Sequence, residues 1–337
     1  MLDAKILRDR TEEVLTIYRQ RLFDDGAAEL AQQALGLDTK RRQLLSLADE
    51  LKAKRNTASQ AIGREKDEAK RAAAIKEMES VKQEIAGLDA QLSETETALD
   101  GLLLQLPNLP EPGVPTGKTD AENIVLRTEG KQFQFSFAPR PHWEIGESLG
   151  ILDFERGVKI SGSRFYVLKG AGAALQRALI SWMLDVHIDQ GYTEVYPPYM
   201  VKQQCLFGTA QLPKFGDNLY RDAEEDFYFI PTAEVPVTNL YRDEILEAET
   251  LPVKHVAYSA CFRREKLAAG RDTRGMKRGH QFDKVEMVQF VRPEESAKAL
   301  LGLLDDAESI LRALELPYRV IQMCTGDLSF AACEKFD

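Results

Sequence analysis

The sequence predicts an α+β fold in which a long antiparallel two-helix coiled-coil arm precedes a mixed or antiparallel sheet flanked by helices. Apolar residues recur three and four positions apart in the first third of the chain. A proline-rich segment follows, and short alternating segments are then interspersed with helical ones. With 337 residues, 44% hydrophobic and 29% charged, the chain has the composition of a soluble globular protein and the length of two domains.

A helical hairpin is predicted within residues 38–106. The second helix has apolar positions at coiled-coil spacing, interrupted once by threonine: Ile75, Met78, Val81, Ile85, Leu88, Leu92, Thr95, Leu99, Leu102 and Leu106. The first helix has a looser pattern, made by Leu44, Leu47, Leu51, Ala58 and Ile62, and the chain reverses within residues 63–68. At about 1.5 Å per residue the second helix would extend roughly 55 Å, so we expect it to project into solvent.

One stretch of this hairpin is basic although the whole chain is acidic. Ten basic and six acidic residues between Asp38 and Arg71 leave a local charge of +4, whereas the formal net charge of the chain is −10. The hairpin is therefore either a dimerisation rod or spacer, or a contact for a polyanion.

Four prolines in residues 107–117 end the hairpin, because proline neither continues a helix nor fills a central strand. We therefore divide the chain into a helical arm at residues 1–106, a linker at 107–117 and a sheet domain at 118–337. The predicted strands of this domain are residues 164–170, 192–198, 226–231, 253–262 and 280–291, and its predicted helices are residues 173–190 and 294–314. Neither GxGxxG nor GxxxxGK[ST] occurs, which argues against a dinucleotide-binding or P-loop fold.

Membrane, secretory and metal-binding classes are disfavoured. No run of about 18 apolar residues occurs and the N-terminus is charged, so we expect a cytoplasmic protein with no membrane partner. The cysteines form no CxxC pair and lie at metal spacing from no histidine: Cys205, Cys261, Cys324 and Cys333. Neither a zinc site nor a disulfide framework is predicted.

A basic cluster lies between the last two predicted strands. Residues 266–279 contain five cations and one acid, a local charge of +4 that favours a bound anion. If the flanking segments pair as a hairpin, one face carries a cation, two carboxylates and an aromatic ring: Arg263, Glu265, Phe282 and Glu286. These groups could clamp a phosphate, accept hydrogen bonds from an amine and stack on a planar base. The alternative is an exposed sheet face with cross-strand ion pairs.

Several motifs in order resemble the seryl-tRNA synthetase family of class II aminoacyl-tRNA synthetases. The segments "FRRE", "GRDTRG" and "HQFDKVE" within residues 262–286 resemble its motif 2, and "GYTEVYPPYMV" at 191–201 resembles motif 1. "FGTAQLPKF" at 207–215 and "FIPTAEVPVTNLYRDEIL" at 229–246 resemble its serine-site region, and the hairpin followed by "LPNLP" resembles its tRNA-binding arm. The resemblance implies a class II fold, an antiparallel sheet flanked by helices, and a homodimer formed through motif 1.

The reaction implied by this resemblance joins L-serine and ATP, with Mg2+, into seryl adenylate and then transfers the seryl group to tRNA(Ser). By position, Arg263 would be the catalytic residue, bridging the ATP α-phosphate and the serine carboxylate. The implied ATP-binding residues are Arg263, Arg264, Glu265, Arg278, Gly279, His280, Gln281 and Phe282. The implied serine-binding residues are Thr232, Ala233, Glu234, Arg263 and Glu286. For tRNA we expect contacts from Arg41, Arg55 and Lys66, and we expect no protein-bound metal within these residues.

Each of these roles has a structural alternative. Thr232 could cap a helix, Glu286 could pair with Lys284, and Phe282 could belong to the core. Their joint occurrence favours the synthetase interpretation, since discrimination of serine needs buried polar groups.

Three features depart from the family pattern. Residues 265–270 replace Glu-Ala-Gly-Ser-Ala-Gly with Glu-Lys-Leu-Ala-Ala-Gly, and Gly279 replaces a branched residue, which predicts a looser ATP pocket. Motif 3 and the metal-binding glutamate do not occur in these 337 residues. We therefore expect a truncated form with an open sheet edge, weak ATP binding and negligible aminoacylation. The alternatives are a synthetase-like paralogue and an RNA-binding coiled-coil adaptor without this activity.

Overall fold

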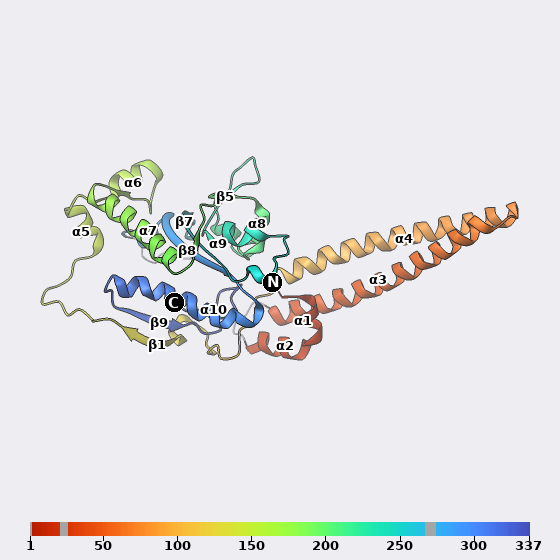
Figure 1. Ribbon diagram of the computed structural model, residues 1–337, viewed down its shortest axis with the longest axis horizontal. Helices are drawn as coiled ribbons and strands as arrows, with labels where there is room; N and C mark the ends of the chain where they lie inside the picture. Colours follow the sequence, from red (N-terminus) through yellow and green to blue (C-terminus); the bar gives the residue numbers. More distant parts are fainter. Residues whose placement is uncertain (1, 21–25, 267–273) are drawn as a thin grey trace. The chain divides into compact units, whose positions relative to one another are not determined.

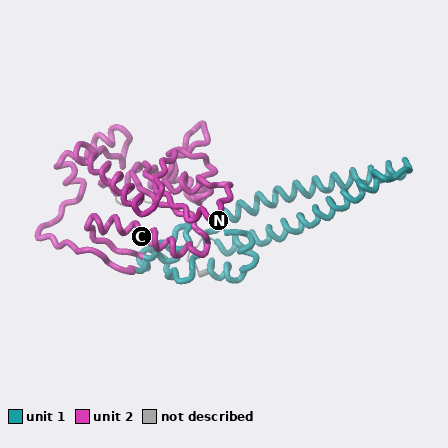
Figure 2. The backbone as a smooth tube through the Cα atoms, in the orientation of Figure 1, with its two compact units in different colours: residues 1–124, 322–335 teal, residues 125–321, 336–337 magenta. Residues whose placement is uncertain are grey.

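The computed structural model describes residues 2–20, 26–266 and 274–337, and the chain divides into two compact units (Figure 2). Residues 1–124 and 322–335 form the first unit, and residues 125–321 and 336–337 form the second.

The first unit is dominated by two long antiparallel helices, α3 (Ala27–Arg64) and α4 (Glu68–Leu103), which lie side by side (Figure 1). The turn between them is stabilised by Asp67, whose Oδ1 accepts hydrogen bonds from the backbone N–H groups of Ala69 and Lys70 at 3.0 and 3.2 Å. Such an N-cap satisfies donors that have no partner inside the helix. The predicted helical hairpin is confirmed.

The seam between the arm helices differs from the predicted one at two positions. Ala48 is buried, whereas Leu47 is 50% exposed, because Ala48 continues the alternating four- and three-residue spacing from Leu44. Ile75, near the tip, is 49% exposed. Thr95 is buried as predicted by its seam position, and its hydroxyl donates to the carbonyl of Gln91 at 2.7 Å.

Two short helices, α1 (Ala4–Asp9) and α2 (Thr11–Gln20), pack at the base of the arm. The core there is formed by Leu2, Leu7, Val14, Leu15, Tyr18, Ala27, Ala31, Ala34, Leu99, Leu103 and Leu106. Beside this core Asp38 is only 2% exposed, and its carboxylate accepts from Arg8 at 3.0 Å and from Arg41 at 2.9 Å. Arg42 Nε lies 3.2 Å from the same carboxylate.

The proline-rich segment pairs with the segment 322–335 inside the first unit. The N–H of Asn108 donates to the carbonyl of Phe330 at 2.9 Å, and the N–H of Gly326 donates to the carbonyl of Gly117 at 2.9 Å. The proline-rich segment belongs to no sheet, and residues 322–335 supply hydrogen-bond partners for its backbone N–H and C=O groups.

The remaining helices and strands are β1 (Ile124–Glu129), α5 (His142–Ser148), β2 (Leu152–Asp153), α6 (Phe154–Ser161), β3 (Val167–Leu168), α7 (Ala171–Asp189), β4 (Thr193–Glu194), β5 (Met200–Val201), α8 (Gln203–Gly208), β6 (Tyr228–Phe229), α9 (Glu234–Thr238), β7 (Val253–Phe262), β8 (Gln281–Phe290), α10 (Ser296–Ala313) and β9 (Tyr318–Gln322). Strands β1 and β9 pair, as do β2 with β3 and β5 with β6.

The central sheet has the order β4-β7-β8, with β7 antiparallel to β8 and parallel to β4. The β7–β8 register runs from Val253 opposite Phe290 to Phe262 opposite Gln281. The predicted mixed sheet and its two long strands are confirmed. The segments predicted as strands at 164–170, 192–198 and 226–231 contribute only two strand residues each, and two of them contain prolines, which lack the N–H that a ladder requires.

The two faces of this sheet are covered by different helices. Helix α7 packs against β7 and β8 on one face, and α9 packs against β8 on the other. Ala233, Val237, Ala257, Val195 and Val288 form the small apolar contact beneath α9. Because strand side chains alternate, each residue of β8 belongs either to the α7 face or to the α9 face.

Candidate active site

Strands β7 and β8 bring most of the predicted site residues together. Their pairing continues past the strand ends, since Arg263 N–H donates to the carbonyl of His280 at 3.0 Å and His280 Nδ1 lies 2.9 Å from the carbonyl of Arg263. Phe282, Lys284 and Glu286 share one face of β8, the face against which α9 packs.

Arg263 is fixed in orientation by two contacts. Its Nε donates to the carbonyl of Pro231 at 3.1 Å, and its guanidinium carbon lies 4.9 Å from the centre of the Phe282 ring. A cation over an aromatic face is attracted by the ring quadrupole. Within the described residues its terminal nitrogens have no hydrogen-bond partner, so they are available to an anion.

A cavity of about 340 Å³ opens beside this stack and is lined by Arg263, Glu265, Lys277, Arg278, Gly279 and Phe282. Arg278 Nη1 lies 3.3 Å from Glu265 Oε2, and the Glu265 side chain is 11% exposed. Three cations against one carboxylate give the lining the positive potential that a polyphosphate requires. Of the other basic-loop residues, Arg271 and Asp272 lie outside the described residues.

The remaining predicted nucleotide contacts lie away from this lining. Gln281 is exposed, and the Arg264 guanidinium lies 5.7 Å from the Tyr220 ring and lines a separate cavity of about 460 Å³.

Gly279 belongs to the cavity lining and has little free space around it. A Cβ placed on Gly279 would lie 2.9 Å from the carbonyl of Gln281 and 3.1 Å from the Tyr166 ring. The space that a branched residue would fill is already occupied, which is contrary to the looser pocket expected from this glycine.

A second polar cluster lies further along the same face of β8. Thr232 is 3% exposed, and its hydroxyl donates to Glu286 Oε2 at 2.8 Å. Thr232 Oγ1 in turn accepts from Lys284 Nζ at 2.8 Å and from the backbone N–H of Glu234 at 3.1 Å. Lys284 also forms an ion pair with Glu286. Thr232 therefore binds the N–H of Glu234, the first residue of α9, and belongs to the polar cluster at the same time.

Glu234 has the least favourable environment for charge in this cluster. Burial raises the pKa of Glu234, and the nearby carboxylate of Glu286 raises it further. Lys284 and Arg263 act in the opposite direction. Arg263 lines the cavity and bonds to the carbonyl of Pro231, the residue before Thr232, so the cavity and the polar cluster adjoin.

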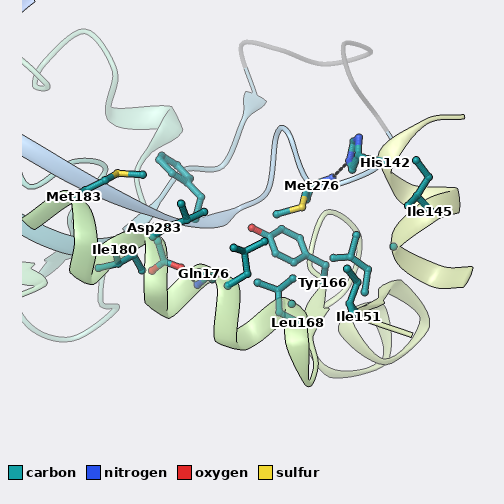
Figure 3. A pocket seen from close by; sticks show the side chains of 16 residues that line it. His142, Ile145, Ile151, Tyr166, Leu168, Gln176, Ile180, Met183, Met276 and Asp283 are labelled. Carbon is teal, nitrogen blue, oxygen red and sulfur yellow. Dashed lines mark hydrogen bonds between the residues drawn. The ribbon is translucent and has the colours of Figure 1, made fainter. Parts of the chain in front are cut away.

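Behind the sheet, on the α7 side, lies an apolar cavity of about 570 Å³ (Figure 3). Side chains of α5 and α7 line it together with Tyr166, Met276 and Asp283, and Phe282, near the end of β8, contributes to the lining of both this cavity and the one beside Arg263. At its wall, Asp283 accepts hydrogen bonds from Gln176 of α7 and from the Tyr258 hydroxyl, the latter at 2.8 Å. No sequence pattern had indicated this cavity, because its lining comes from two distant parts of the chain, within residues 142–183 and 276–283.

Comparisons with known proteins identify the family. Residues 1–110 match the family model described as the seryl-tRNA synthetase N-terminal domain, and residues 215–337 match the tRNA synthetase class II core domain (G, H, P, S and T). The serine–tRNA ligase of Roseiflexus sp. (strain RS-1) is 54% identical over 337 residues, which are 100% of this chain and 79% of that protein. The chain belongs to the seryl-tRNA synthetase family.

A second serine–tRNA ligase and two solved structures of the same family also match this chain. The serine–tRNA ligase of Chloroflexus aurantiacus (strain ATCC 29366 / DSM 635 / J-10-fl) is 52% identical over 100% of this chain and 79% of that protein. The crystal structure of seryl-tRNA synthetase from Pyrococcus horikoshii complexed with ATP matches with a TM-score of 0.93 and 35% identity, over 100% of this chain and 80% of that chain. The cytoplasmic serine–tRNA ligase from Naegleria fowleri in complex with AMP matches with a TM-score of 0.85 and 26% identity, over 100% and 78%.

The predicted class II synthetase fold and family are thereby confirmed. The chain is a seryl-tRNA synthetase, a class II ligase that activates L-serine with ATP and transfers it to tRNA(Ser).

The residues predicted to bind tRNA differ in their surroundings. Lys66 is exposed in the turn between the arm helices, whereas Arg41 bonds to buried Asp38 at the base. Arg55 is half-buried on α3, with Nη2 lying 3.4 Å from Asn56 Oδ1.

The described residues offer neither a metal-ligand cluster nor a membrane-spanning helix. Within residues 2–20, 26–266 and 274–337, no group of three histidine, cysteine or acidic side chains could hold a metal ion. No helix in this part of the synthetase is long and apolar enough to span a membrane.

Proposed function

We propose that the cavity beside Arg263 is the ATP site of this seryl-tRNA synthetase and that the Thr232 cluster is its serine site. The observation that carries the proposal is the oriented Arg263 guanidinium, which is stacked on Phe282 at 4.9 Å, lines the cavity and bonds to Pro231 beside Thr232. Adenine would stack on Phe282, Arg278 would bind the outer phosphates, and Glu265 would accept from the adenine amino group.

The chemistry needs orientation and positive charge rather than a protein nucleophile. The serine carboxylate attacks the α-phosphorus of ATP, a phosphorus–oxygen bond to serine forms, and the bond to pyrophosphate breaks. Arg263 would bind the α-phosphate and the serine carboxylate together and stabilise the charge that develops at phosphorus. The seryl group of the adenylate then passes to a terminal hydroxyl of tRNA(Ser), and AMP leaves.

The serine site would use the hydrogen-bonding groups of Thr232, Glu234 and Glu286, with Ala233 holding the turn between the first two. These groups are buried or half-buried, so an amino acid that left them without partners would bind poorly.

Mg2+ would enter with the nucleotide. Glu265 is the only carboxylate in the described lining of the cavity and it is paired with Arg278, so these residues do not form a magnesium site. The phosphates of ATP would carry the ion.

The proposal also covers the roles of the two domains, the location of the protein and its oligomeric state. Residues 1–106 would be the tRNA-binding arm and residues 118–337 the catalytic domain, joined by 107–117. The protein would act in the cytoplasm as a homodimer through α7 and the strand after it, where Leu175 is 59% and Ile188 40% exposed.

Serine-dependent ATP–pyrophosphate exchange tests these assignments. Arg263→Ala should lower the exchange rate by about 10²–10³-fold, the usual cost of removing one charge-stabilising donor. Arg319→Ala, an exposed arginine of β9, is the matched control and should leave the rate unchanged. Exchange by Arg263→Ala within twofold of the unaltered protein would rule out the proposed site.

A further inference from the structure

Lys284 lies inside the amino-acid site but has no part in the roles assigned above. It stands between Phe282 and Glu286 on the same face of β8. Its Nζ lies 2.8 Å from Thr232 Oγ1 and pairs with the carboxylate of Glu286. The lysine ammonium therefore uses the two groups that would bind the substrate.

The hydrogen-bonding capacity of Thr232 is fully used in this arrangement. A hydroxyl has one proton and two lone pairs. The proton goes to Glu286, and the lone pairs accept from Lys284 Nζ and from the backbone N–H of Glu234. A further donor cannot bond to Thr232 Oγ1 unless one of these two leaves, and the backbone N–H is fixed by α9.

The chemistry of the occupant matches that of the substrate. The α-ammonium of an amino acid, like the lysine ammonium, is a compact cation with three N–H donors. The lysine side chain is 32% exposed and has a flexible four-carbon stem, so its head can move toward solvent.

We propose that Lys284 is a resident cation of the amino-acid site, whose ammonium holds the position of the substrate α-ammonium until serine displaces it. This inference rests on the assignment of Thr232 and Glu286 to the serine site. The exchange keeps the charge of the site constant, because one cation leaves the two carboxylates of Glu234 and Glu286 as another arrives. Amino-acid binding is thereby opposed by a competitor that belongs to the protein itself.

A calorimetric titration of the Lys284→Met variant with L-serine measures this competition. Methionine keeps the length of the side chain and removes the cation. If Lys284 occupies its acceptors about nine-tenths of the time, its removal should lower the Kd for serine about tenfold. Glycerate, which has the hydroxyl and carboxylate but no ammonium, should gain nothing. Lys284→Arg keeps the cation, and Lys298→Met changes an exposed lysine of α10; neither should tighten serine binding.

Weaker or unchanged serine binding by a folded Lys284→Met protein would overturn the proposal and make Lys284 a structural partner of Glu286. Folding of the variant is checked by its melting temperature and its KM for ATP. Failure of the serine-site assignment is distinguishable, since it would appear as unchanged serine binding by Thr232→Val and Glu286→Gln.

A second measurement needs no variant. Acetylation of Lys284 by acetic anhydride, quantified by mass spectrometry, should become faster when L-serine is added, because the displaced amine loses its two partners. Glycerate should not accelerate it. Equal or slower acetylation in the presence of serine would contradict displacement.

Discussion

At the scale of single residues, Glu234 combines a role in binding with a cost in stability. Its pKa is raised in the folded protein by burial and by Glu286. A raised folded pKa stabilises the folded state below the unfolded pKa of about 4.3, and this contribution is lost as the pH rises through the folded value. At neutral pH the ionised carboxylate therefore opposes folding.

Glu234→Gln should consequently raise the melting temperature at pH 8, by about 2 °C if the gain is near 1 kcal/mol, and the difference should shrink as the pH falls below about 4. The same variant should raise the KM for serine, since glutamine cannot balance an ammonium. Thermal unfolding at pH 8 and pH 4 measures the first effect, and Glu244→Gln, an exposed glutamate, is the control. A variant less stable than the parent at pH 8 would refute the assigned electrostatics.

Phe282 allows a second residue-scale test, because it is half-buried under Arg263 and lies at the ATP cavity. Phe282→Leu keeps an apolar side chain but removes the aromatic face, so the KM for ATP should rise about tenfold, within the range measured for one base stacked on a ring. The KM for serine should change little. Phe290→Leu, on the same strand but packed against Tyr241 and His255, should lower stability without changing the KM for ATP.

At the scale of elements, the α7 face of β8 is fixed by one carboxylate. Asp283 accepts from Gln176 on α7 and from Tyr258 on β7, so a single side chain joins three elements behind the site. Burial raises the pKa of Tyr258, and the hydrogen bond to Asp283 and the charge of Asp283 raise it further. The Tyr258 hydroxyl therefore stays protonated and donates to Asp283.

Asp283→Leu should therefore destabilise the protein by about 2–4 kcal/mol, because it leaves two donors without their charged acceptor. The loss is measured as a shift in the urea midpoint. In a double-mutant cycle, Tyr258→Phe should cost much less in the Asp283→Leu background than in the parent. Asp185→Asn, an exposed aspartate on α7, controls for charge loss alone. Additive effects of the Asp283 and Tyr258 changes would show that the hydrogen bond contributes nothing.

The elements that sequence predicted best are those whose pattern is long and regular. Residues 253–262 were predicted as a strand and form β7, and the predicted helix at 173–190 forms α7 within two residues at each end. The short strands were overestimated because prolines interrupt their ladders. Period-two alternation brought Arg263 and Phe282 onto one face, whereas the bond from Lys284 to Thr232 spans 52 residues and leaves no local pattern.

At the scale of the whole molecule, the arm depends on a buried charge at its base. Burial by itself would raise the pKa of Asp38, but the hydrogen bonds from Arg41 and Arg8 outweigh it and the pKa is lowered. A lowered folded pKa contributes stability above the unfolded pKa of about 3.9, and this contribution is lost as the pH falls through the folded value.

Asp38→Asn should accordingly lower the melting temperature at pH 7, and the difference from the parent should vanish at a pH low enough to protonate Asp38 in the folded protein. The loss of stability should be about 1.5–3 kcal/mol, the usual contribution of a hydrogen bond to a charged group, since the arginines left behind are 29–49% exposed and can be hydrated. Asp49→Asn, an exposed aspartate on the same helix, is the matched control. A melting difference that is the same at pH 7 and in acid would show that the Asp38 charge does not stabilise the base.

Residues 38–71 of the arm carry a local charge of +4 in a chain of net charge −10, so contact with tRNA should depend on a few cations that contribute unequally to binding. Lys66 is exposed at the tip, and its replacement by alanine should weaken tRNA(Ser) binding and reduce the slope of log K against log salt by about 0.7–0.9. Arg41 already binds Asp38, so Arg41→Ala should lower the melting temperature and change the salt slope less than Lys66→Ala does. Arg55→Ala, half-buried on α3, should fall between them. Titrations at several salt concentrations measure these slopes, with Lys298→Ala of α10 as control. If Lys66→Ala left the slope unchanged, the tip would not be a phosphate contact, and the positive charge of residues 38–71 would need another explanation.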